Sequence, residues 1–399
     1  MGKVAEGWRG FRSARELPIA VDGLRRTVIT RWRGRDARTV GLRMLDGGSL
    51  ASVEAELRRR LGHTNGNGTS RRDLRSGRTY LVTGCAGFIG SHLVEALVAR
   101  GCSVVGADAF IDNYPRPAKE RNLEHCLAHG RVQFAEVDLA EDPIEPLLEG
   151  VDGVFHLAAR PGVRSSWGAT FDAYLHDNLL ATQRVFEAAV AHEVRVVYAS
   201  SSSVYGDAHA YPLREESRLA PVSPYGVTKL ACEALANAYA RSCGLDAVGL
   251  RYFSVYGPRQ RPDMAFSRVL GCLDDDRPFG LLGSGRQTRD FTYVGDVVDA
   301  TLGAMQRAPS GRVYNVGGGS EISLLDSLAL CERIVGRTLD LRRKPVAAGD
   351  ARRTIADVRR AWTELGWKPV TSLERGLRAQ ARAVRSRSAE RSVACAGRS

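Results

Sequence analysis

The sequence predicts an α/β protein with a doubly wound parallel sheet and a smaller mixed α/β lobe after it. Three observations predict this fold. Strand-like apolar runs alternate with helical stretches from residue 79 onward, a glycine-rich turn joins the first strand to the first helix, and the alternation ends near residue 258. In such open sheets ligands bind beyond the carboxyl ends of the strands. We therefore expect the ligand site between the sheet and the lobe.

The expected elements follow one another in a regular order. Strand-like runs lie at 79–83, 102–107, 132–137, 151–157, 194–199 and 246–251, and helical stretches such as 175–191 and 225–243 separate them. Short helices and strands then predict the lobe, with strand-like segments at 283–294, 313–319 and 339–343. The pattern divides the chain into an N-terminal extension at 1–77, a core domain at 78–257, a lobe at 258–373 and a C-terminal tail at 374–399.

The positive charge of the chain is concentrated at its two ends. The 399 residues include 57 Lys and Arg against 45 Asp and Glu, a net charge of +12. Residues 1–78 hold 18 basic and 8 acidic residues, and 374–399 hold 7 and 2, so the part between them is slightly acidic. Charge runs of this kind are usually solvated. We expect basic, disordered ends with one short helix at Ser49–Leu61, and no nucleic-acid partner.

Neither a membrane span nor a targeting peptide is expected. Arginines interrupt every apolar stretch near the N-terminus, and no apolar run reaches the roughly eighteen residues that a span needs. The eight cysteines form no Cys-x-x-Cys pair and no His/Cys cluster at metal-ligand spacing. They therefore indicate reduced thiols in a cytoplasmic protein without a metal site.

The glycine-rich turn predicts a dinucleotide site. Gly84, Gly87 and Gly90 follow the strand-like Thr79–Thr83 and precede a helical stretch. The first glycine permits a tight turn, the second lets the backbone approach a pyrophosphate, and the third lets the helix pack on the strand. Asp108 ends the second strand, where a carboxylate binds ribose hydroxyls and repels a 2′-phosphate. This is a Rossmann-type arrangement, and the carboxylate favours NAD over NADP.

Asp138 is a second carboxylate at the end of a strand-like run. It closes Val132–Val137, from where it would meet the adenine of a dinucleotide. It also stands immediately before Leu139 in the position of a helix N-cap. The two roles are equally compatible with the sequence.

A serine cluster and a Tyr-x-x-x-Lys pair indicate where the chemistry takes place. Ser201 lies in the run that follows strand 194–199, and Tyr225 and Lys229 are four residues apart, on one face of a helix. A phenol is a poor base at neutral pH because its pKa is about 10, but a neighbouring ammonium stabilises the phenolate. A serine at the strand tip can hold the same substrate hydroxyl. Together with the dinucleotide turn, these residues predict hydride chemistry on an alcohol.

These motifs stand in the order of a known family. TGCAGFIG, HLAA (His156–Ala159), SSSSVYG, SPYGVTK and RYFSVYGPR make the chain from about Arg78 to Leu373 similar to extended short-chain dehydrogenases/reductases of the NAD-dependent sugar epimerase/dehydratase family. Two further segments, Ala159–Gly168 and Arg261–Ala265, resemble the UDP-glucuronate 4-epimerases in particular. The resemblance implies a UDP-sugar substrate and a homodimer.

The resemblance also implies residue roles. Tyr225 is the base for the 4-hydroxyl, Lys229 tunes it and binds the nicotinamide ribose, and Ser201 bridges the hydroxyl. The implied cofactor-binding residues are Gly84, Gly87, Phe88, Ile89, Gly90, Asp108, Asp138, Leu139, Ala158, Tyr225 and Lys229. The implied substrate-binding residues are Arg164, Asn178, Ser202, Ser203, Ser254, Arg261, Arg289, Asp350 and Arg352 or Arg353. Asn178 would orient water and substrate, and Arg289 would bind the diphosphate. For the pair Asp350 and Arg352, a solvated basic loop is an equally good interpretation.

Departures from the family pattern distinguish between its reactions. Family dehydratases have an Asp-Glu pair just after the catalytic Ser/Thr, and UDP-glucuronate decarboxylases keep a Glu there, whereas this chain has Ser202 and Ser203. Without that carboxylate elimination lacks its general acid. Ser254 stands where relatives have Asn or Thr. We therefore expect a 4-epimerase of a UDP-hexose or UDP-hexuronate, with UDP-glucuronate as the first choice. The alternatives are a UDP-glucuronate decarboxylase, an NDP-hexose 4,6-dehydratase, and a non-catalytic NAD(H) sensor or nucleic-acid binder.

Overall fold

The computed structural model describes residues 18–20, 27–31, 40–44, 74, 76–128, 130–345, 349 and 351–396. The chain divides into two compact units, Met1–Ser70 and Arg71–Ser399. The first unit contains an antiparallel sheet in the order β1 (Pro18–Ala20), β2 (Thr27–Arg31) and β3 (Val40–Met44). These strands lie in the segment 1–77, for which the sequence predicts disorder, although the β-branched residues of β2 favour a strand. The helix expected at Ser49–Leu61 lies outside the described residues.

The larger unit is organised around a seven-stranded sheet whose neighbouring strands all run parallel. From edge to edge the strands are β14 (Val313–Val316), β9 (Ala247–Tyr252), β8 (Val196–Ser201), β7 (Gly153–His156), β4 (Thr79–Thr83), β5 (Ser103–Asp108) and β6 (Val132–Glu136). Every residue of β7 and β9 is buried, as expected for strands covered on both faces. The doubly wound parallel sheet is confirmed.

One strand of this sheet comes from the segment that we assigned to the lobe. Six strands match the predicted runs, but β14 pairs with β9 and so belongs to the sheet. Its four residues are too short a run to show which sheet they join, because that depends on the neighbouring strand. The core sheet therefore extends beyond the expected boundary at residue 257.

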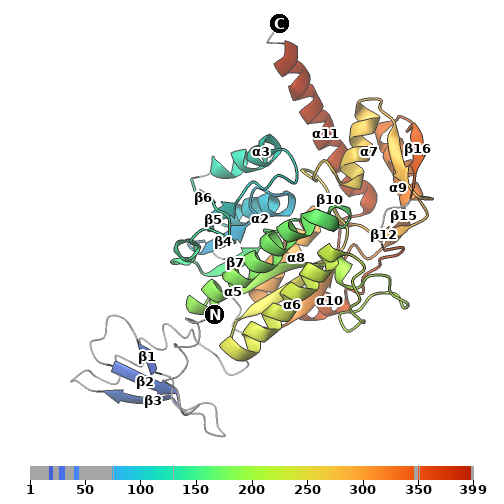
Figure 1. Ribbon diagram of the computed structural model, residues 1–399. Helices are drawn as coiled ribbons and strands as arrows, with labels where there is room; N and C mark the ends of the chain where they lie inside the picture. The colour runs from blue at the N-terminus through green and yellow to red at the C-terminus, as the bar shows by residue number, and fades with distance from the viewer. Residues whose placement is uncertain are drawn as a thin grey trace. The chain divides into compact units, whose positions relative to one another are not determined.

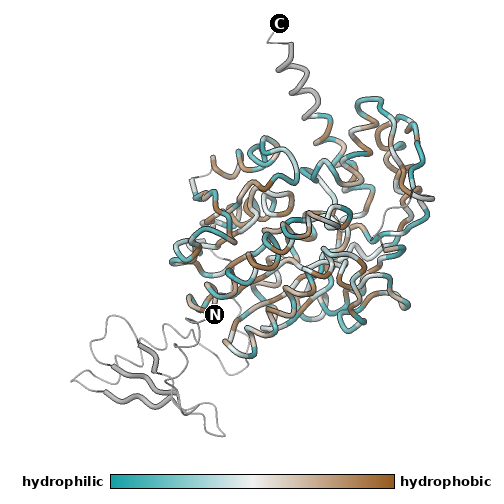
Figure 2. Tube along the Cα trace, in the orientation of Figure 1, coloured by the Kyte–Doolittle hydropathy of each residue, from teal (hydrophilic) through white to brown (hydrophobic). Residues whose placement is uncertain are grey.

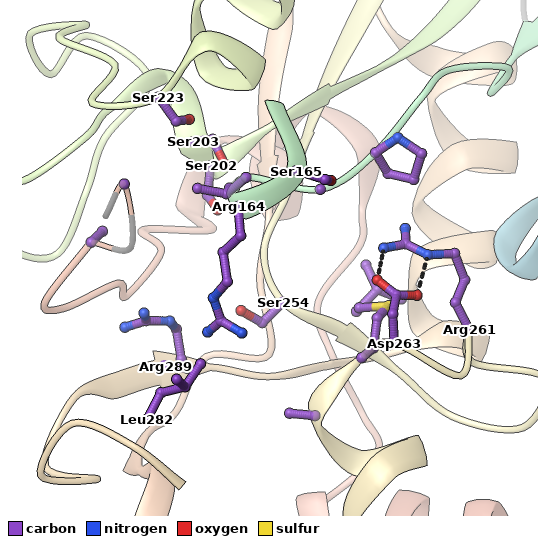
Figure 3. Close-up of a pocket in the computed structure, with 18 of the residues that line it drawn as sticks. Arg164, Ser165, Ser202, Ser203, Ser223, Ser254, Arg261, Asp263, Leu282 and Arg289 are labelled. Carbon is purple, nitrogen blue, oxygen red and sulfur yellow. Dashed lines mark hydrogen bonds and ion pairs between the residues drawn. The ribbon is translucent and has the colours of Figure 1, made fainter. Parts of the chain in front are cut away.

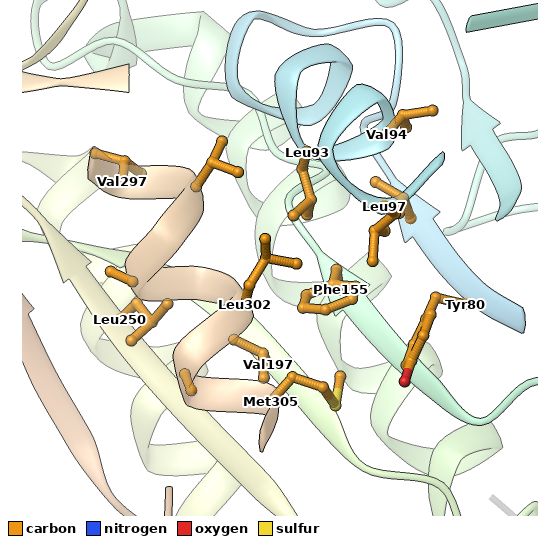
Figure 4. Packing of buried hydrophobic residues seen from close by; sticks show 14 of the residues in the cluster. Tyr80, Leu93, Val94, Leu97, Phe155, Val197, Leu250, Val297, Leu302 and Met305 are labelled. Carbon is orange, nitrogen blue, oxygen red and sulfur yellow. The ribbon is translucent and has the colours of Figure 1, made fainter. Parts of the chain in front are cut away.

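Helices cover both faces of the sheet (Figure 1). On one face α2 (Phe88–Ala99) and α8 (Val294–Arg307) pack with the strands in one hydrophobic cluster, in which Leu93, Leu302 and Phe155 meet (Figure 4). On the other face Phe186 of α5 (Ala181–Ala191) packs against the strands, with α6 (Pro224–Cys243) beside it. Hydrophobic segments run through the sheet and the flanking helices (Figure 2). The remaining helices around the sheet are α3 (Arg116–Leu127), α4 (Phe171–Tyr174), a π-helix (Leu175–Leu180), α10 (Arg359–Leu365) and short 3-10 turns at Glu145–Leu148, Arg164–Ser166, Gly168–Thr170 and Ser202–Val204.

The lobe has its own small core and three short strand pairs. Its helices are α7 (Ala265–Asp274), α9 (Leu324–Val335) and α11 (Leu373–Ala396). The pairs are β11 (Phe279–Leu282) with β16 (Leu341–Lys344), β12 (Thr288–Asp290) with β15 (Glu321–Ser323), and β10 (Val255–Tyr256) with β13 (Thr292–Tyr293). The expectation of a disordered tail at 374–399 is wrong for α11, because Leu377 and Ala381, one turn apart, are buried in the lobe core. None of the described helices is long and apolar enough to cross a bilayer.

Candidate active site

The glycine turn after β4 leaves no room for side chains. Gly84 has φ +70°, and a Cβ there would lie 2.7 Å from the backbone nitrogen of Ala158. A Cβ on Gly90 would lie 2.1 Å from the carbonyl oxygen of Gly84. The turn therefore brings the N-terminus of α2 directly against the strand end, where backbone N–H groups and the helix dipole favour a phosphate.

Asp108 at the end of β5 is held close to this turn. Its carboxylate accepts hydrogen bonds from the backbone N–H of Ala86, at 3.1 Å, and of Phe110, at 2.8 Å. Burial raises the pKa of Asp108, and these two bonds and the ammonium of Lys119 oppose the rise. The carboxylate thus stays oriented toward the space in front of the turn.

A cavity of about 410 Å³ lies in front of the turn. It is lined by all eleven residues expected to bind the cofactor: Gly84, Gly87, Phe88, Ile89, Gly90, Asp108, Asp138, Leu139, Ala158, Tyr225 and Lys229. Asp138 lines the cavity, as the adenine-binding role requires. Its carboxylate also accepts a bond from the backbone N–H of Ala140 at 2.9 Å, but the residues after it form a turn, so the alternative of a helix N-cap is wrong. The glycine cradle and the strand-end carboxylate fit an NAD molecule.

Lys119 of α3 also lines this cavity, and sequence reasoning missed it. Its ammonium donates to the carbonyl of Ile111, and burial lowers its pKa while Asp108 opposes that effect. No motif marks this lysine in the sequence. Its importance depends on how α3 packs beside β5.

Ser201, Tyr225 and Lys229 line the same cavity. Helix α6 begins at Pro224, and the Ser223 side chain caps it by accepting from the N–H of Gly226 at 3.1 Å. Tyr225 therefore lies in the first turn of α6 and Lys229 one turn later.

Contacts with neighbouring residues fix each of the three reactive side chains. Lys229 is 5% exposed, and its ammonium donates to the carbonyl oxygen of Ala199 on β8 at 3.0 Å. The Ser201 hydroxyl accepts a hydrogen bond from the backbone N–H of Ser203 at 3.1 Å and donates one to the Ser203 hydroxyl at 3.1 Å. The Tyr225 ring packs edge-on against Tyr174, with centroids 6.3 Å apart. This geometry can support proton abstraction from an alcohol beside the dinucleotide cavity.

A second cavity, of about 680 Å³, adjoins the first and is rich in arginine and serine. Ser202, Ser203, Ser254 and Arg261 line both cavities, so the two meet at the tips of β8 and β9. The expected substrate residues that line the second cavity are Arg164, Ser202, Ser203, Ser254, Arg261 and Arg289. Figure 3 shows the guanidinium groups of Arg164 and Arg289 extending toward the same region, beside Ser254.

Arg261 lies apart from those two arginines and makes an ion pair with Asp263 (Figure 3). Its Nε and Nη2 donate to the two carboxylate oxygens of Asp263 at 3.0 and 2.8 Å. The Arg261 side chain is 15% exposed. The pair holds the guanidinium plane at the junction of the two cavities.

Two expected substrate residues that the structure describes, Asn178 and Arg352, line neither cavity. Asn178 is fully buried, and its amide accepts from the N–H of Arg160 at 2.7 Å and donates to the carbonyl of Arg160 and the hydroxyl of Thr228. It therefore supports the chain that leads to Arg164 and does not contact the substrate space directly. Arg352 bonds Asp207 through its backbone N–H.

Arg353, the expected alternative to Arg352, contacts other residues of the protein through its side chain. Arg353 forms two hydrogen bonds of 2.7 Å with Glu321 and lies over the ring of Tyr211. Asp350 lies outside the described residues. Neighbouring Gly349, Ala351 and Thr354 do line the cavity. Sequence reasoning also missed Arg268 and Gln287, which line the cavity without belonging to a recognisable motif. Among the described residues no group of three or more His, Cys, Asp or Glu could hold a metal ion.

Comparison with known proteins agrees with this geometry. The model of the NAD dependent epimerase/dehydratase family matches residues 80–317. A Bacillus subtilis protein, "Uncharacterized UDP-glucose epimerase YtcB", is 44% identical over 300 residues, covering 74% of this chain and 95% of the relative. A UDP-glucuronate 4-epimerase from Thermodesulfobacterium geofontis is 34% identical over 306 residues, covering 75% and 94%.

Solved structures show the same similarity. The crystal structure of UDP-glucuronic acid 4-epimerase from Bacillus cereus in complex with UDP-glucuronic acid and NAD is 40% identical, with a TM-score of 0.75, and the match covers 77% of this chain and 99% of that one. MoeE5 in complex with UDP-glucose and NAD is 41% identical, with a TM-score of 0.70 over the same shares of the two chains.

Proposed function

The chain belongs to the NAD-dependent epimerase/dehydratase family, and on that premise we propose that it is an NAD-dependent 4-epimerase of a UDP-sugar, with UDP-glucuronate as its substrate. One observation carries the proposal. Ser201, Tyr225 and Lys229 line the same cavity as the glycine turn, and an arginine-rich cavity adjoins them. A sugar alcohol and a dinucleotide can therefore meet at one phenol.

The chain's own residues supply the proton chemistry. The glycine turn and Asp108 would hold NAD, which would supply a reversible hydride acceptor for C4 of the sugar. Tyr225 takes the proton of the 4-hydroxyl, and the Lys229 ammonium stabilises the phenolate. The carbonyl of Ala199 holds that ammonium, at 3.0 Å. The Ser201 hydroxyl aligns the substrate hydroxyl with the base.

Inversion at C4 requires the 4-keto sugar to turn over, so that its opposite face is directed at the nicotinamide before reduction. The protein must therefore bind the nucleotide of the substrate firmly and its hexose loosely. Arg164 and Arg289 are suited to the diphosphate because guanidinium groups bind phosphate through paired hydrogen bonds. The short hydroxyls of Ser202, Ser203 and Ser254 are suited to a hexose that turns over.

The absence of a general acid at the strand tip argues against the alternative reactions. Asp263 is the one carboxylate among the described residues that line the substrate cavity, and Arg261 occupies both of its oxygens. Elimination of water needs a free acid there. A sensor has no need of a phenol activated by an ammonium, so the pair of Tyr225 and Lys229 also argues against a non-catalytic role.

Tyr225→Phe tests the proposed base. We expect kcat to fall by about 10²–10⁴-fold, because the base is lost while the binding surfaces remain. Affinities for NAD and UDP should be retained, and product masses for the unaltered protein should equal that of the substrate. Loss of mass equal to water or carbon dioxide would identify a dehydratase or decarboxylase instead. Turnover that survives Tyr225→Phe would show that Tyr225 is not the base.

The substrate carboxylate creates a particular need for control. A 4-keto uronate is a β-keto acid, which loses carbon dioxide when the breaking bond aligns with the ketone. We infer that Arg261, with Ser202 and Ser203, holds the carboxylate out of that alignment. Arg261→Ala should raise the share of pentose product made from UDP-glucuronate. An unchanged ratio of epimer to pentose would refute this role.

We also propose that the protein acts as a cytoplasmic homodimer. Leu175 and Leu180 of the π-helix and Val227 of α6 are 38–48% exposed, so adjoining elements present apolar side chains to a partner. The seven cysteines whose side chains the structure describes are all free thiols, in keeping with a reducing compartment. Light scattering coupled to size-exclusion chromatography measures the mass directly, and a monomer would refute the dimer.

A further inference from the structure

Three consecutive side chains in the loop between β10 and α7 point to three different parts of the molecule. Arg259 reaches α2 of the sheet domain, Gln260 reaches the lobe, and Arg261 lines both cavities. The loop thus joins the cofactor side of the site to the sugar side.

Arg259 is bound tightly to helix α2. Its Nη1 and Nη2 donate to the two carboxylate oxygens of Glu95, both at 2.6 Å. Its Nη2 also lies 2.6 Å from Nδ1 of His92, and His92 Nε2 lies 2.9 Å from the carbonyl oxygen of Pro258. Arg259 Nε also lies 3.3 Å from His92 Nε2. Because a guanidinium can only donate, Nδ1 of His92 accepts, and the shorter contact at Nε2 is the one with the carbonyl of Pro258, to which a neutral imidazole donates. Burial and the charge of Arg259 lower the pKa of His92 to about 4, which agrees with that form.

Arg259 keeps these contacts in a strained backbone conformation. Its φ is +64°, in the left-handed region that residues other than glycine seldom adopt. Strain of this kind persists only where surrounding contacts hold the backbone in place. The ion pair with Glu95, with the Arg259 side chain 18% exposed, is such a contact.

Gln260 anchors the other side of the loop to the lobe. It is 4% exposed, and its Oε1 accepts from the N–H of Ser267 at 3.0 Å and from Nε2 of Gln380 at 2.8 Å. Gln380 in turn accepts from the N–H of Gly257 at 3.0 Å. The loop is therefore fixed to α7 and α11 on one side and to α2 on the other.

We propose that Arg259 is a positioning residue that, through Glu95 and His92, holds Arg261 in register with the cofactor-binding turn. We call the contacts of Arg259 with Glu95 and His92 the Arg259 latch. Helix α2 begins at Phe88, immediately after the glycine turn, so the Arg259 latch connects the loop to the helix whose N-terminus would face the pyrophosphate. The effect of the Arg259 latch on catalysis rests on the proposed function. Its effect on the conformation of the loop is independent of that function.

Hydrogen exchange of the NAD-loaded protein tests the structural half. Glu95→Gln keeps the shape of the partner and removes its charge, and Arg259→Lys keeps a charge but loses the paired bonds. We expect amide exchange in residues 257–264 to be at least about tenfold faster in Glu95→Gln and less strongly accelerated in Arg259→Lys. Glu374→Gln, which breaks the exposed ion pair with Arg378, is the matched control. Unchanged exchange of the loop in Glu95→Gln would overturn the latch.

A double-mutant cycle tests whether the latch acts through Arg261. With UDP-glucuronate, Glu95→Gln should lower kcat about tenfold or more with little change in KM, and should raise the share of pentose product. In an Arg261→Ala background the same substitution should have no further effect, because the group that it positions is gone. Additive effects in the cycle would overturn the positioning role. If the unaltered protein epimerises no UDP-sugar, the proposed function fails, and the exchange measurement still decides the latch.

Discussion

Arg251 and Glu233 form a buried ion pair beneath the reactive side chains. Arg251 Nε and Nη2 donate to the two carboxylate oxygens at 2.9 and 2.7 Å, and the two side chains are 4% and 8% exposed. Glu233 also accepts from the Ser200 hydroxyl, and Arg251 donates to the hydroxyl of Tyr205 at 2.7 Å. The pair therefore fastens α6, which carries Tyr225, to strands β8 and β9.

Removing one partner of this pair should be strongly destabilising. Arg251→Met leaves the Glu233 carboxylate buried without a counter-charge, and such losses cost about 3–5 kcal/mol. Urea denaturation of the NAD-free protein measures the free energy of unfolding. Glu374→Gln, which breaks the exposed pair with Arg378, is the control and should have a much smaller effect. Equal effects of the two substitutions would show that the buried pair carries little stability.

Two glycines in helices should respond in opposite ways to alanine. A Cβ on Gly90 would lie 2.1 Å from the carbonyl oxygen of Gly84, whereas a Cβ on Gly271 in α7 would have no atom within 4 Å. Gly90→Ala should therefore lower the melting temperature and weaken NAD binding by at least about tenfold. Gly271→Ala should stabilise the protein by about 0.5–1 kcal/mol, because alanine favours a helix. NAD affinity that is unaltered in Gly90→Ala would contradict the assigned turn.

The carboxylate of Asp108 should determine the choice between NAD and NADP. Asp108→Asn removes the charge that repels a 2′-phosphate and weakens the bonds to the ribose hydroxyls. We expect weaker NAD binding and a ratio of NADP to NAD affinity that rises about tenfold or more. Titration of the apoprotein with each dinucleotide, followed by tryptophan fluorescence, measures both constants. A ratio that does not change would place the source of selectivity elsewhere in the cavity.

The sequence could predict those parts of the site that short motifs encode. The glycine turn and the pair of Tyr225 and Lys229 are local patterns, because a strand end and one helical turn determine where their side chains lie. Lys119 and Arg259 could not be found in this way. Arg259 matters because of His92, which is 167 residues away, and only the packing of the loop on α2 brings them together.

Burial explains the other differences. Asn178 resembles a substrate-orienting residue in the sequence, but its side-chain amide makes its hydrogen bonds to Arg160 and Thr228. The sequence of helix α11 indicates a basic tail because it contains six arginines against two acidic residues, although Leu377 and Gln380 are fully buried. In both segments a few tertiary contacts outweigh the average composition.

His156 should make the protein less stable as the pH falls. The imidazole is buried between the hydroxyls of Thr83 and Thr182, at 2.8 and 3.0 Å, and burial, with a contribution from Lys229, lowers the pKa of His156 to about 3. In the unfolded chain a histidine titrates near 6.5. Between these values the unfolded state binds more protons, so stability is complete above about pH 6.5 and is lost as the pH falls toward 3. His156→Gln should reduce the slope of unfolding free energy against pH between 4 and 6 by up to about 1.4 kcal/mol per unit. Denaturant titrations at several pH values measure both slopes, and identical slopes would mean that His156 is already protonated in the folded protein.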